Sequence, residues 1–408
     1  MTRRKHSRAG TMLTGAFSIL GWALGAGGRR KRRRMSDDDW RKVGWVALIV
    51  GVLGIIACAV GAAFDLRAAL QAWLFAAIVW IGFPLGAMAM LMCHNLTAGG
   101  WGEVSRPILK AMIATLPLTI IAFVPLLIEP QAVFSWIAPP AALEWVVQRK
   151  AYWLNVPLLW ALTAVIFVIW LALAWTLNVW RHEPAYKRPY GASGGGMVVW
   201  GVTITFFAFF WLLSLQPEFY SDIFGMVYFS DPLVVAPASV LLALGLANPV
   251  RDEQLTSRMQ DIANLLLAAL CGWIFVNFVQ YLIIWNGNIP DEIAWYIPRS
   301  RHGWQWFTRT LFIFYFALPF AALLSATVKR SRVALILLSA FVLFSHALFS
   351  YWLIMPSLHK DAFYIDWLVW AALIGLGGLS AALFGFMLPR CIANSEVAAE
   401  AGAVAENG

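Results

Sequence analysis

Long runs of hydrophobic residues dominate this sequence, and the polar residues collect in short segments between them. Ten runs come close to the ~20 apolar residues that a helix needs to cross a bilayer. They cover residues 43–63, 71–92, 109–128, 155–178, 197–215, 223–247, 262–285, 308–328, 333–355 and 364–388. The pattern predicts an all-α polytopic membrane protein: a basic N-terminal segment (1–42), a domain of about ten transmembrane helices (43–390) and a tail (391–408).

The sixth run depends on an Asp-Pro pair. Leu233 to Ala247 alone is too short to cross a bilayer, so this span requires that Asp231 and Pro232 lie inside it. An aspartate before a proline is also the pattern of a helix N-cap followed by proline at the first helical position. We favour the N-cap interpretation over a buried carboxylate.

The seventh run contains Asn277, Gln280 and Tyr281 at helical spacing, which predicts that these polar groups share one face. Polar side chains inside a span face protein or water rather than lipid. The run ends at a turn signal, residues 286–290 (NGNIP), and a charged and aromatic cluster from Asp291 to Arg299 follows, which we expect at the membrane surface.

The composition supports a membrane protein, because 61% of the residues are hydrophobic and only 12% are charged. The 23 tryptophans suit a polytopic chain, since Trp and Tyr settle at membrane interfaces. The net charge of +9 arises mainly in the first 34 residues, beside a membrane span, and this position argues against nucleic-acid binding.

The distribution of positive charge predicts the orientation. With the N-terminus in the cytoplasm and ten alternating spans, 23 of the 30 Lys and Arg residues fall on the cytoplasmic side. Both termini are therefore predicted to be cytoplasmic. Met35 is an alternative translation start, and the small, acidic, Ala-rich tail from Asn394 to Gly408 is predicted to be disordered.

His346 lies near the middle of the ninth run and is the strongest candidate for chemistry. An imidazole inside a bilayer requires a partner, and it marks a functional site by default. A proton relay and a hydrogen bond to a quinone head group are the functional interpretations. A structural hydrogen bond between helices is the alternative.

Three further residues are candidates for a proton path. Asp366 begins the tenth span, where an acid also suits the helix dipole. Asp222 lies in a polar loop on the predicted outer side, and His94 lies just past the second span on the predicted cytoplasmic side. With Asp231, Asn277, Gln280 and Tyr281, these residues complete the candidate set around His346.

The chain carries no evident cofactor motif or catalytic motif of its own. Its four cysteines form no CxxC pair, and only one histidine is clearly mid-span, whereas haem b between helices needs two that face each other. We therefore expect no covalently bound cofactor and no metal site.

Several stretches together resemble one family. They are HNLT (94–97) with GWG (100–102), YWLN (152–155), SLQP (214–217) with YS (220–221) and IFG (223–225), QYLIIW (280–285) with GNIP (287–290), and FALPF (316–320). This pattern resembles the ActF-type membrane subunit of alternative complex III, a relative of the NrfD and polysulfide-reductase membrane subunits. The resemblance covers about residues 43–388.

The resemblance implies two four-helix bundles plus flanking helices in a bacterial inner membrane. It implies a quinol-oxidising respiratory complex that passes electrons to a cytochrome c or an oxidase. The expected partners are an ActC-type membrane subunit, an iron–sulfur subunit and c-type cytochromes, which would carry the haem c and iron–sulfur clusters. In that family the ActC-type subunit is the better-supported quinol site, and the ActF-type chain is discussed as a proton path or scaffold.

The chain departs from the family at two positions. The family tends to have an acid where this chain has Gln216, and an Asp where it has Phe349. These differences weaken the expectation that protons follow the family's route. A stand-alone secondary transporter and a purely structural anchor for redox subunits are the competing functions, although the inverted pair of broken helices typical of many transporters is not evident.

Overall fold

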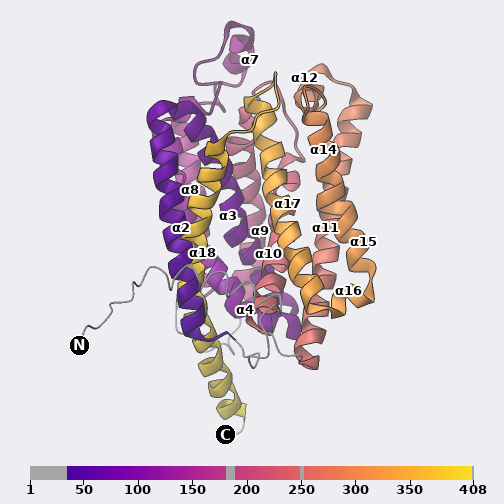
Figure 1. Cartoon of the computed structure of the whole chain (residues 1–408). Helices are drawn as coiled ribbons and strands as arrows, with labels where there is room; N and C mark the ends of the chain where they lie inside the picture. The colour runs from indigo at the N-terminus through magenta and orange to yellow at the C-terminus, as the bar shows by residue number, and fades with distance from the viewer. Residues whose placement is uncertain (1–34, 181–188, 249–251, 407–408) are drawn as a thin grey trace, which may run out of the picture.

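The computed structural model describes residues 35–180, 189–248 and 252–406, and these residues form helices and no strand (Figure 1). Within them, ten helical segments are long and apolar enough to cross a membrane. The predicted class, an all-α polytopic membrane protein, is confirmed. The basic segment 1–34, and with it the test of Met35 as a start, lies outside the described residues.

The ten spans match the ten predicted runs and extend several of them. They are α2 (Asp37–Phe64), α3 (Leu66–Thr97), α4–α6 (Gly100–Ile113, Leu116–Ile121, Val124–Ile128), α8 (Val156–Thr176), α9 with η3 (Tyr190–Trp211, Leu213–Leu215), α10 (Phe224–Ala247), α11 (Glu253–Gly287), α14–η4–α15 (Trp304–Phe312, Ile313–Ala317, Leu318–Leu324), α17 (Arg332–Leu358) and α18 (Trp367–Glu406). Short helices connect them: η1 (Pro130–Ala132), η2 (Ala141–Leu143), α7 (Glu144–Arg149), α12 (Pro290–Ile293), α13 (Tyr296–Arg299) and α16 (Ala326–Arg330).

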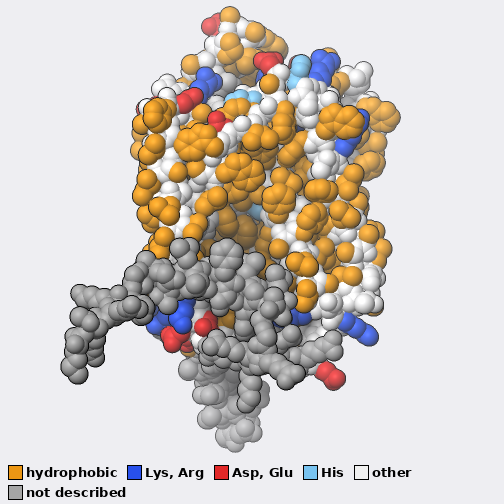
Figure 2. Space-filling view, viewed as in Figure 1, with side chains coloured by type: hydrophobic (Ala, Val, Ile, Leu, Met, Phe, Trp, Pro, Cys, Tyr) orange, Lys and Arg blue, Asp and Glu red, His pale blue; other side chains and the backbone are white. Residues whose placement is uncertain are grey.

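The spans pack in two groups with a flanking pair. The first group contains α3, α4–α6, α8 and α9, and the second contains α10, α11, α14–α15 and α17. Helices α3 and α10 contact each other and join the two groups, and the first and last spans, α2 and α18, pack side by side (Figure 1). Hydrophobic side chains cover most of the visible flank of the molecule, as a lipid-facing surface requires (Figure 2).

The two ends of the bundle are distinguished by the chain itself. Met35 lies beside the end of α10, because its amide donates to the Ala247 carbonyl, and the C-terminal part of α18 lies at the same end of the bundle. We call this end the terminal face. The other end, which carries α7 and α12, is the opposite face (Figure 1). Helix α18 continues to Glu406, so much of the tail that its composition predicts to be disordered is helical. Its Ala and Glu residues are strong helix formers.

Helix α10 corrects the expectation for Asp231. The helix begins at Phe224 and continues through Pro232 and Pro237, so Asp231 lies in its interior, where it is buried. The N-cap interpretation is therefore wrong. Pro232 removes one N–H donor from the helix. Membrane spans tolerate such a proline because neighbouring helices can satisfy the carbonyl that this leaves free.

Glycines hold three helices at close range. A Cβ atom at Gly82 would lie 3.2 Å from the His346 ring, and a Cβ at Gly86 would overlap the main chain of Pro232. The Gly82–Gly86 pattern on α3 therefore seats both α10 and the imidazole from α17. A second seam joins α2 to α18, where a Cβ at Gly54 would lie 2.6 Å from the Gly375 nitrogen.

We predict that Gly86→Ala destabilises the protein by about 1–3 kcal/mol, because the new methyl group must displace the α10 backbone. Gly272→Ala is the matched control, since no atom lies within 4 Å of a Cβ at that position. Thermal unfolding of the two variants in detergent tests the difference. Equal melting temperatures would show that α3 and α10 are not in close contact.

Candidate functional site

A buried imidazole–carboxylate pair lies in the interior of the membrane domain. His346 on α17 and Asp231 on α10 are each 1% exposed. The His346 Nδ1 atom lies 2.7 Å from Asp231 Oδ2, and its Nε2 atom lies 3.0 Å from the carbonyl oxygen of Val79 on α3. The pair thus joins three spans, and the sequence had identified both of its members as candidates.

Tyr315 completes this site. Its hydroxyl donates a hydrogen bond to Asp231 Oδ1. Tyr315 lies in η4, a π-helical turn (Ile313–Ala317) inside the eighth span, and Pro319 four residues later has no N–H to donate to the Tyr315 carbonyl. Single π turns of this kind recur at functional sites. Sequence analysis missed Tyr315, although the quoted FALPF stretch begins one residue after it.

The geometry fixes the number of protons that the pair holds. With Tyr315 donating to one carboxylate oxygen, a single proton must lie between Nδ1 and Oδ2, and the Nε2–H donates to Val79. Without the shared proton, the lone pair of Nδ1 would face a carboxylate oxygen at 2.7 Å. With a second proton, an N–H of His346 and an O–H of Asp231 would point at each other and collide. The pair is therefore neutral overall, whichever atom carries the proton, as burial in an apolar medium favours.

Aromatic side chains surround the pair. The Phe83 ring packs edge-on against His346, with 5.6 Å between ring centroids, and it stacks in turn on Trp80. Towards the opposite face, Trp273 and Phe349 contact Tyr315 and each other. Phe349 thus makes this side of the site apolar.

Two buried hydroxyl groups next to the pair have no hydrogen-bond partner within the described part of the chain. Tyr228 precedes Asp231 by three residues on α10, and Ser350 follows His346 by four residues on α17. Helical spacing places each one turn from the pair on the side of the opposite face. Buried hydroxyl groups of this kind usually bind ordered water.

A second polar centre lies nearer the opposite face, around Arg299. This side chain is 2% exposed. All five of its N–H groups have acceptors, which are the carbonyls of Trp295, Trp352 and Leu353 and the side chains of Gln216 and Ser357. No carboxylate is among these partners, and burial lowers the pKa of Arg299 well below its ordinary value.

Arg299 is also held by aromatic rings. Its guanidinium carbon lies 3.4 Å from the Trp295 ring centroid and 5.3 Å from that of Trp352. The chain folds back after Asn288 and buries the side chains of Trp295 and Arg299 inside the protein. That the cluster lies at the membrane surface stays a prediction. The Gln216 amide, which donates to the Ala294 carbonyl, fixes the same loop.

The polar residues of α11 divide between the interior and the surface. Asn277 and Gln280 are buried, as predicted. Asn277 donates to the Trp273 carbonyl of its own helix, and Gln280 lies 3.4 Å from both Ser221 and the Tyr296 hydroxyl. Tyr281 is 47% exposed, so the prediction that it shares their buried face is wrong. None of the three bonds to His346 or Asp231.

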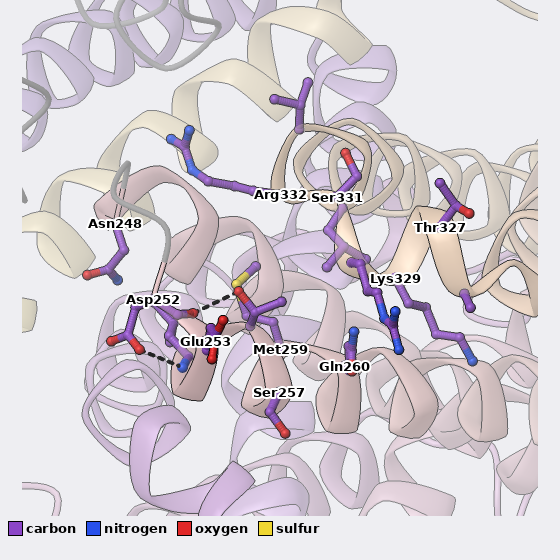
Figure 3. Close-up of a pocket in the computed structure, with 16 residues that line it drawn as sticks. Asn248, Asp252, Glu253, Ser257, Met259, Gln260, Thr327, Lys329, Ser331 and Arg332 are labelled. Carbon is purple, nitrogen blue, oxygen red and sulfur yellow. Dashed lines mark hydrogen bonds between the residues drawn. The ribbon is translucent and has the colours of Figure 1, made fainter.

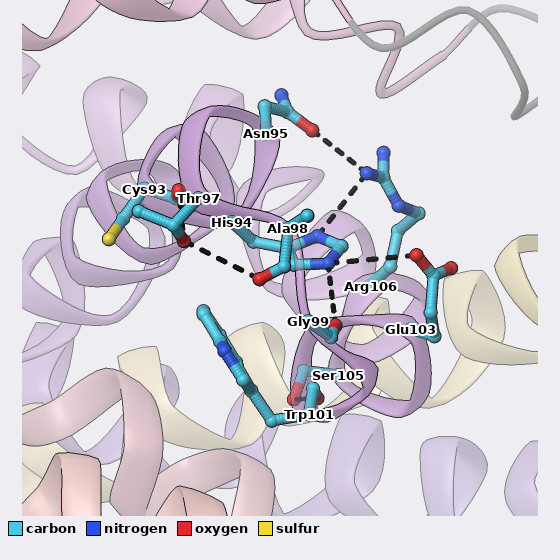
Figure 4. Close-up of polar contacts among 10 residues, drawn as sticks. All are labelled: Cys93, His94, Asn95, Thr97, Ala98, Gly99, Trp101, Glu103, Ser105 and Arg106. Carbon is cyan, nitrogen blue, oxygen red and sulfur yellow. Dashed lines mark hydrogen bonds and ion pairs between the residues drawn. The ribbon is translucent and has the colours of Figure 1, made fainter.

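His94 ties α3 to α4 near the terminal face (Figure 4). Its Nδ1 accepts a hydrogen bond from Arg106, and its Nε2 lies 3.1 Å from the Gly99 carbonyl, to which an Nε2–H would donate. The ring is fully buried, and Arg106 also donates to Asn95, which bonds to Ser193 on α9. These contacts are those of a structural connection between helices.

The two remaining acidic candidates lie away from the pair. Asp366 accepts a hydrogen bond from the Leu368 amide at 2.7 Å and thus caps the start of α18. Asp222 is exposed and lines a cavity of about 310 Å³ at the opposite face, next to Lys150. Lys150 donates to the Pro217 carbonyl, and its partial burial lowers its pKa.

Comparison with known proteins adds no relative. No protein-family model matches the chain, and no curated protein matches it. Among the described residues, no group of three or more His, Cys, Asp or Glu side chains could hold a metal ion. Functional interpretation of the site therefore depends on its own geometry and on the motifs in the sequence.

We predict that Arg299→Lys destabilises the protein by about 3 kcal/mol, because an ammonium group with three donors cannot replace five guanidinium N–H bonds. Arg301→Lys, two residues away and exposed, is the matched control. Denaturant or thermal unfolding compares the two. A loss of stability that is the same for both would contradict the assignment of Arg299 as the connection between α13 and α17.

Proposed function

We propose that this chain is an integral subunit of a quinol-oxidising respiratory complex, in which the His346–Asp231 pair holds a proton in transit across the membrane. The observation that carries this proposal is the pair itself, an imidazole and a carboxylate 2.7 Å apart and shielded from solvent inside the membrane domain. Buried ionisable residues in spans commonly mark proton relays. The family-like motifs supply the respiratory context.

The surroundings of the pair support proton transfer. Tyr228 and Ser350 lie towards the opposite face, and Ser339, which is fully buried and has no partner among the described residues, lies two turns from His346 towards the terminal face. Water bound by these hydroxyl groups would connect the pair to both sides. All four polar atoms of the pair have protein partners, so transfer requires that one of these contacts opens to water. Release of the shared proton to one side, followed by uptake from the other, then restores the same state.

The residues of the pair do not fit a quinone head group. Both ring nitrogens of His346 and both oxygens of Asp231 already have partners within the protein. A quinone carbonyl could bond to them only after one of these contacts broke. In the family that the motifs resemble, the ActC-type subunit is the better-supported quinol site. We therefore place quinol oxidation in a partner subunit and assign to this chain the proton path and the scaffold.

The same proposal includes the location. The resemblance to the ActF-type family implies a bacterial cytoplasmic membrane, and the charge distribution favours both termini on its cytoplasmic side. Met35 and the C-terminal part of α18 lie at the same end of the bundle, as this topology requires (Figure 1). The terminal face would then be the cytoplasmic face, and the proposed redox partners with c-type haem and iron–sulfur clusters would bind at the opposite face.

Asp231→Asn separates a proton role from a structural role. The amide can accept from Tyr315 and donate to Nδ1 of a neutral His346, so the hydrogen bonds survive and stability should change by about 1 kcal/mol or less. The variant cannot share a proton. We expect normal assembly, and we expect proton release per quinol oxidised in proteoliposomes to slow by about tenfold or more.

Asp222→Asn, an exposed carboxylate outside the pair, controls for the loss of one negative charge. If Asp231→Asn released protons at the normal rate, the chain would be an anchor for its partners rather than a proton path. Purification from native membranes tests the remainder of the proposal. A colourless chain that arrives without c-type haem or an iron–sulfur protein would argue against the respiratory complex.

A further inference from the structure

A polar cavity of about 860 Å³ opens at the terminal face, away from the His346–Asp231 pair. The end of α10, the first two turns of α11, α16 and the start of α17 form its walls (Figure 3). Helices α11 and α17 enter the predicted membrane region here. The cavity therefore lies at the depth of the lipid head groups.

Three cations line this cavity within four residues of sequence: Lys329, Arg330 and Arg332. Lys329 is positioned by Asn264, whose side-chain oxygen accepts from its ammonium group at 2.9 Å. The Arg332 Nε donates to the Gly245 carbonyl, and Figure 3 shows its guanidinium on the Asn248 side, away from Lys329. Arg330 is exposed, and no ion pair with it is present among the described residues.

The other lining groups restrict where an anion can bind. Figure 3 shows Asp252 and Glu253 at one end of the cavity and Lys329 at the other, with Gln260 between them. Asp252 already accepts from the amides of Gln254 and Leu255. A negative group is thus repelled by Asp252 and Glu253 and attracted to the end of the cavity that carries Lys329 and Arg330. Thr327 and Gln260 add neutral polar groups to the lining.

We propose that this cavity binds the phosphate group of an anionic phospholipid. Arg and Lys side chains with neutral donors match phosphate oxygens, and basic pockets between spans bind lipid head groups. Apolar side chains of Leu255, Met259 and Leu335 line the same cavity and suit the glycerol and the first methylene groups. A free phosphate ion shares the head-group chemistry but gains nothing from these apolar contacts.

Native mass spectrometry of the purified full-length chain tests the proposal, with phosphatidylglycerol, phosphatidylcholine and inorganic phosphate as separate probes. We expect phosphatidylglycerol to stay bound through washing that removes phosphatidylcholine. The double variant Lys329→Gln with Arg330→Gln should bind phosphatidylglycerol about tenfold more weakly or worse. The charge-preserving variant Lys329→Arg with Arg330→Lys should retain most of the binding.

The double variant Arg149→Gln with Arg301→Gln is the matched control, because it removes the same charge from exposed positions near the opposite face. It should bind phosphatidylglycerol as the unaltered chain does. If the first double variant does not fold, Arg330→Gln alone gives the same comparison at an exposed position. Unchanged phosphatidylglycerol binding by the Lys329 and Arg330 variants would overturn the site, and inorganic phosphate binding as tightly as the lipid would overturn the lipid assignment.

Discussion

The shared proton between His346 and Asp231 is the constraint that the interior of this protein must satisfy. A lone imidazolium or carboxylate at this depth would be unstable in hydrocarbon, whereas the pair with one proton is neutral. Each neighbouring span contributes to that condition. Helix α3 gives the Val79 carbonyl and the space at Gly82, α10 carries the carboxylate on its proline-containing turn, and the π turn η4 brings in the Tyr315 hydroxyl.

Arg299 shows a second way to bury charge. Its cation is stabilised by carbonyl oxygens, by neutral side chains and by two indole rings, and no counter-ion contacts it within the described part of the chain. Between it and the pair lies an apolar layer in which Phe349 contacts both Trp273 and Trp352. The two positions at which the sequence differs from the family it resembles therefore fall at related places. Gln216 leaves Arg299 without an acid, and Phe349 lies in the layer that separates the two centres.

The spans could be predicted because bilayer crossing requires a long apolar run, and that requirement is visible in one dimension. His346 could be predicted as buried for the same reason. Asp231 was a candidate, but its pairing with His346 could not be predicted. Asp231-Pro232 has the local pattern of a helix start, and only the packing of α3 and α17 against α10 shows otherwise. Tyr315 could not be predicted either, because no pattern of polar residues surrounds it and a π turn sets the direction of its side chain. Arg299 sits among charged and aromatic residues that suit a surface, and the fold of the loop after Asn288 buries it.

The seam between α2 and α18 has a consequence for how the chain is made. The first span presents Gly51 and Gly54 to a partner that leaves the ribosome only after some 300 further residues. At about 5–20 residues per second, α2 waits on the order of 15–60 seconds in the membrane before α18 arrives. During that interval its glycine face contacts lipid or the insertion machinery. Completion of the domain is therefore linked to the end of translation, and a chain truncated before residue 367 would retain an open edge along its first helix.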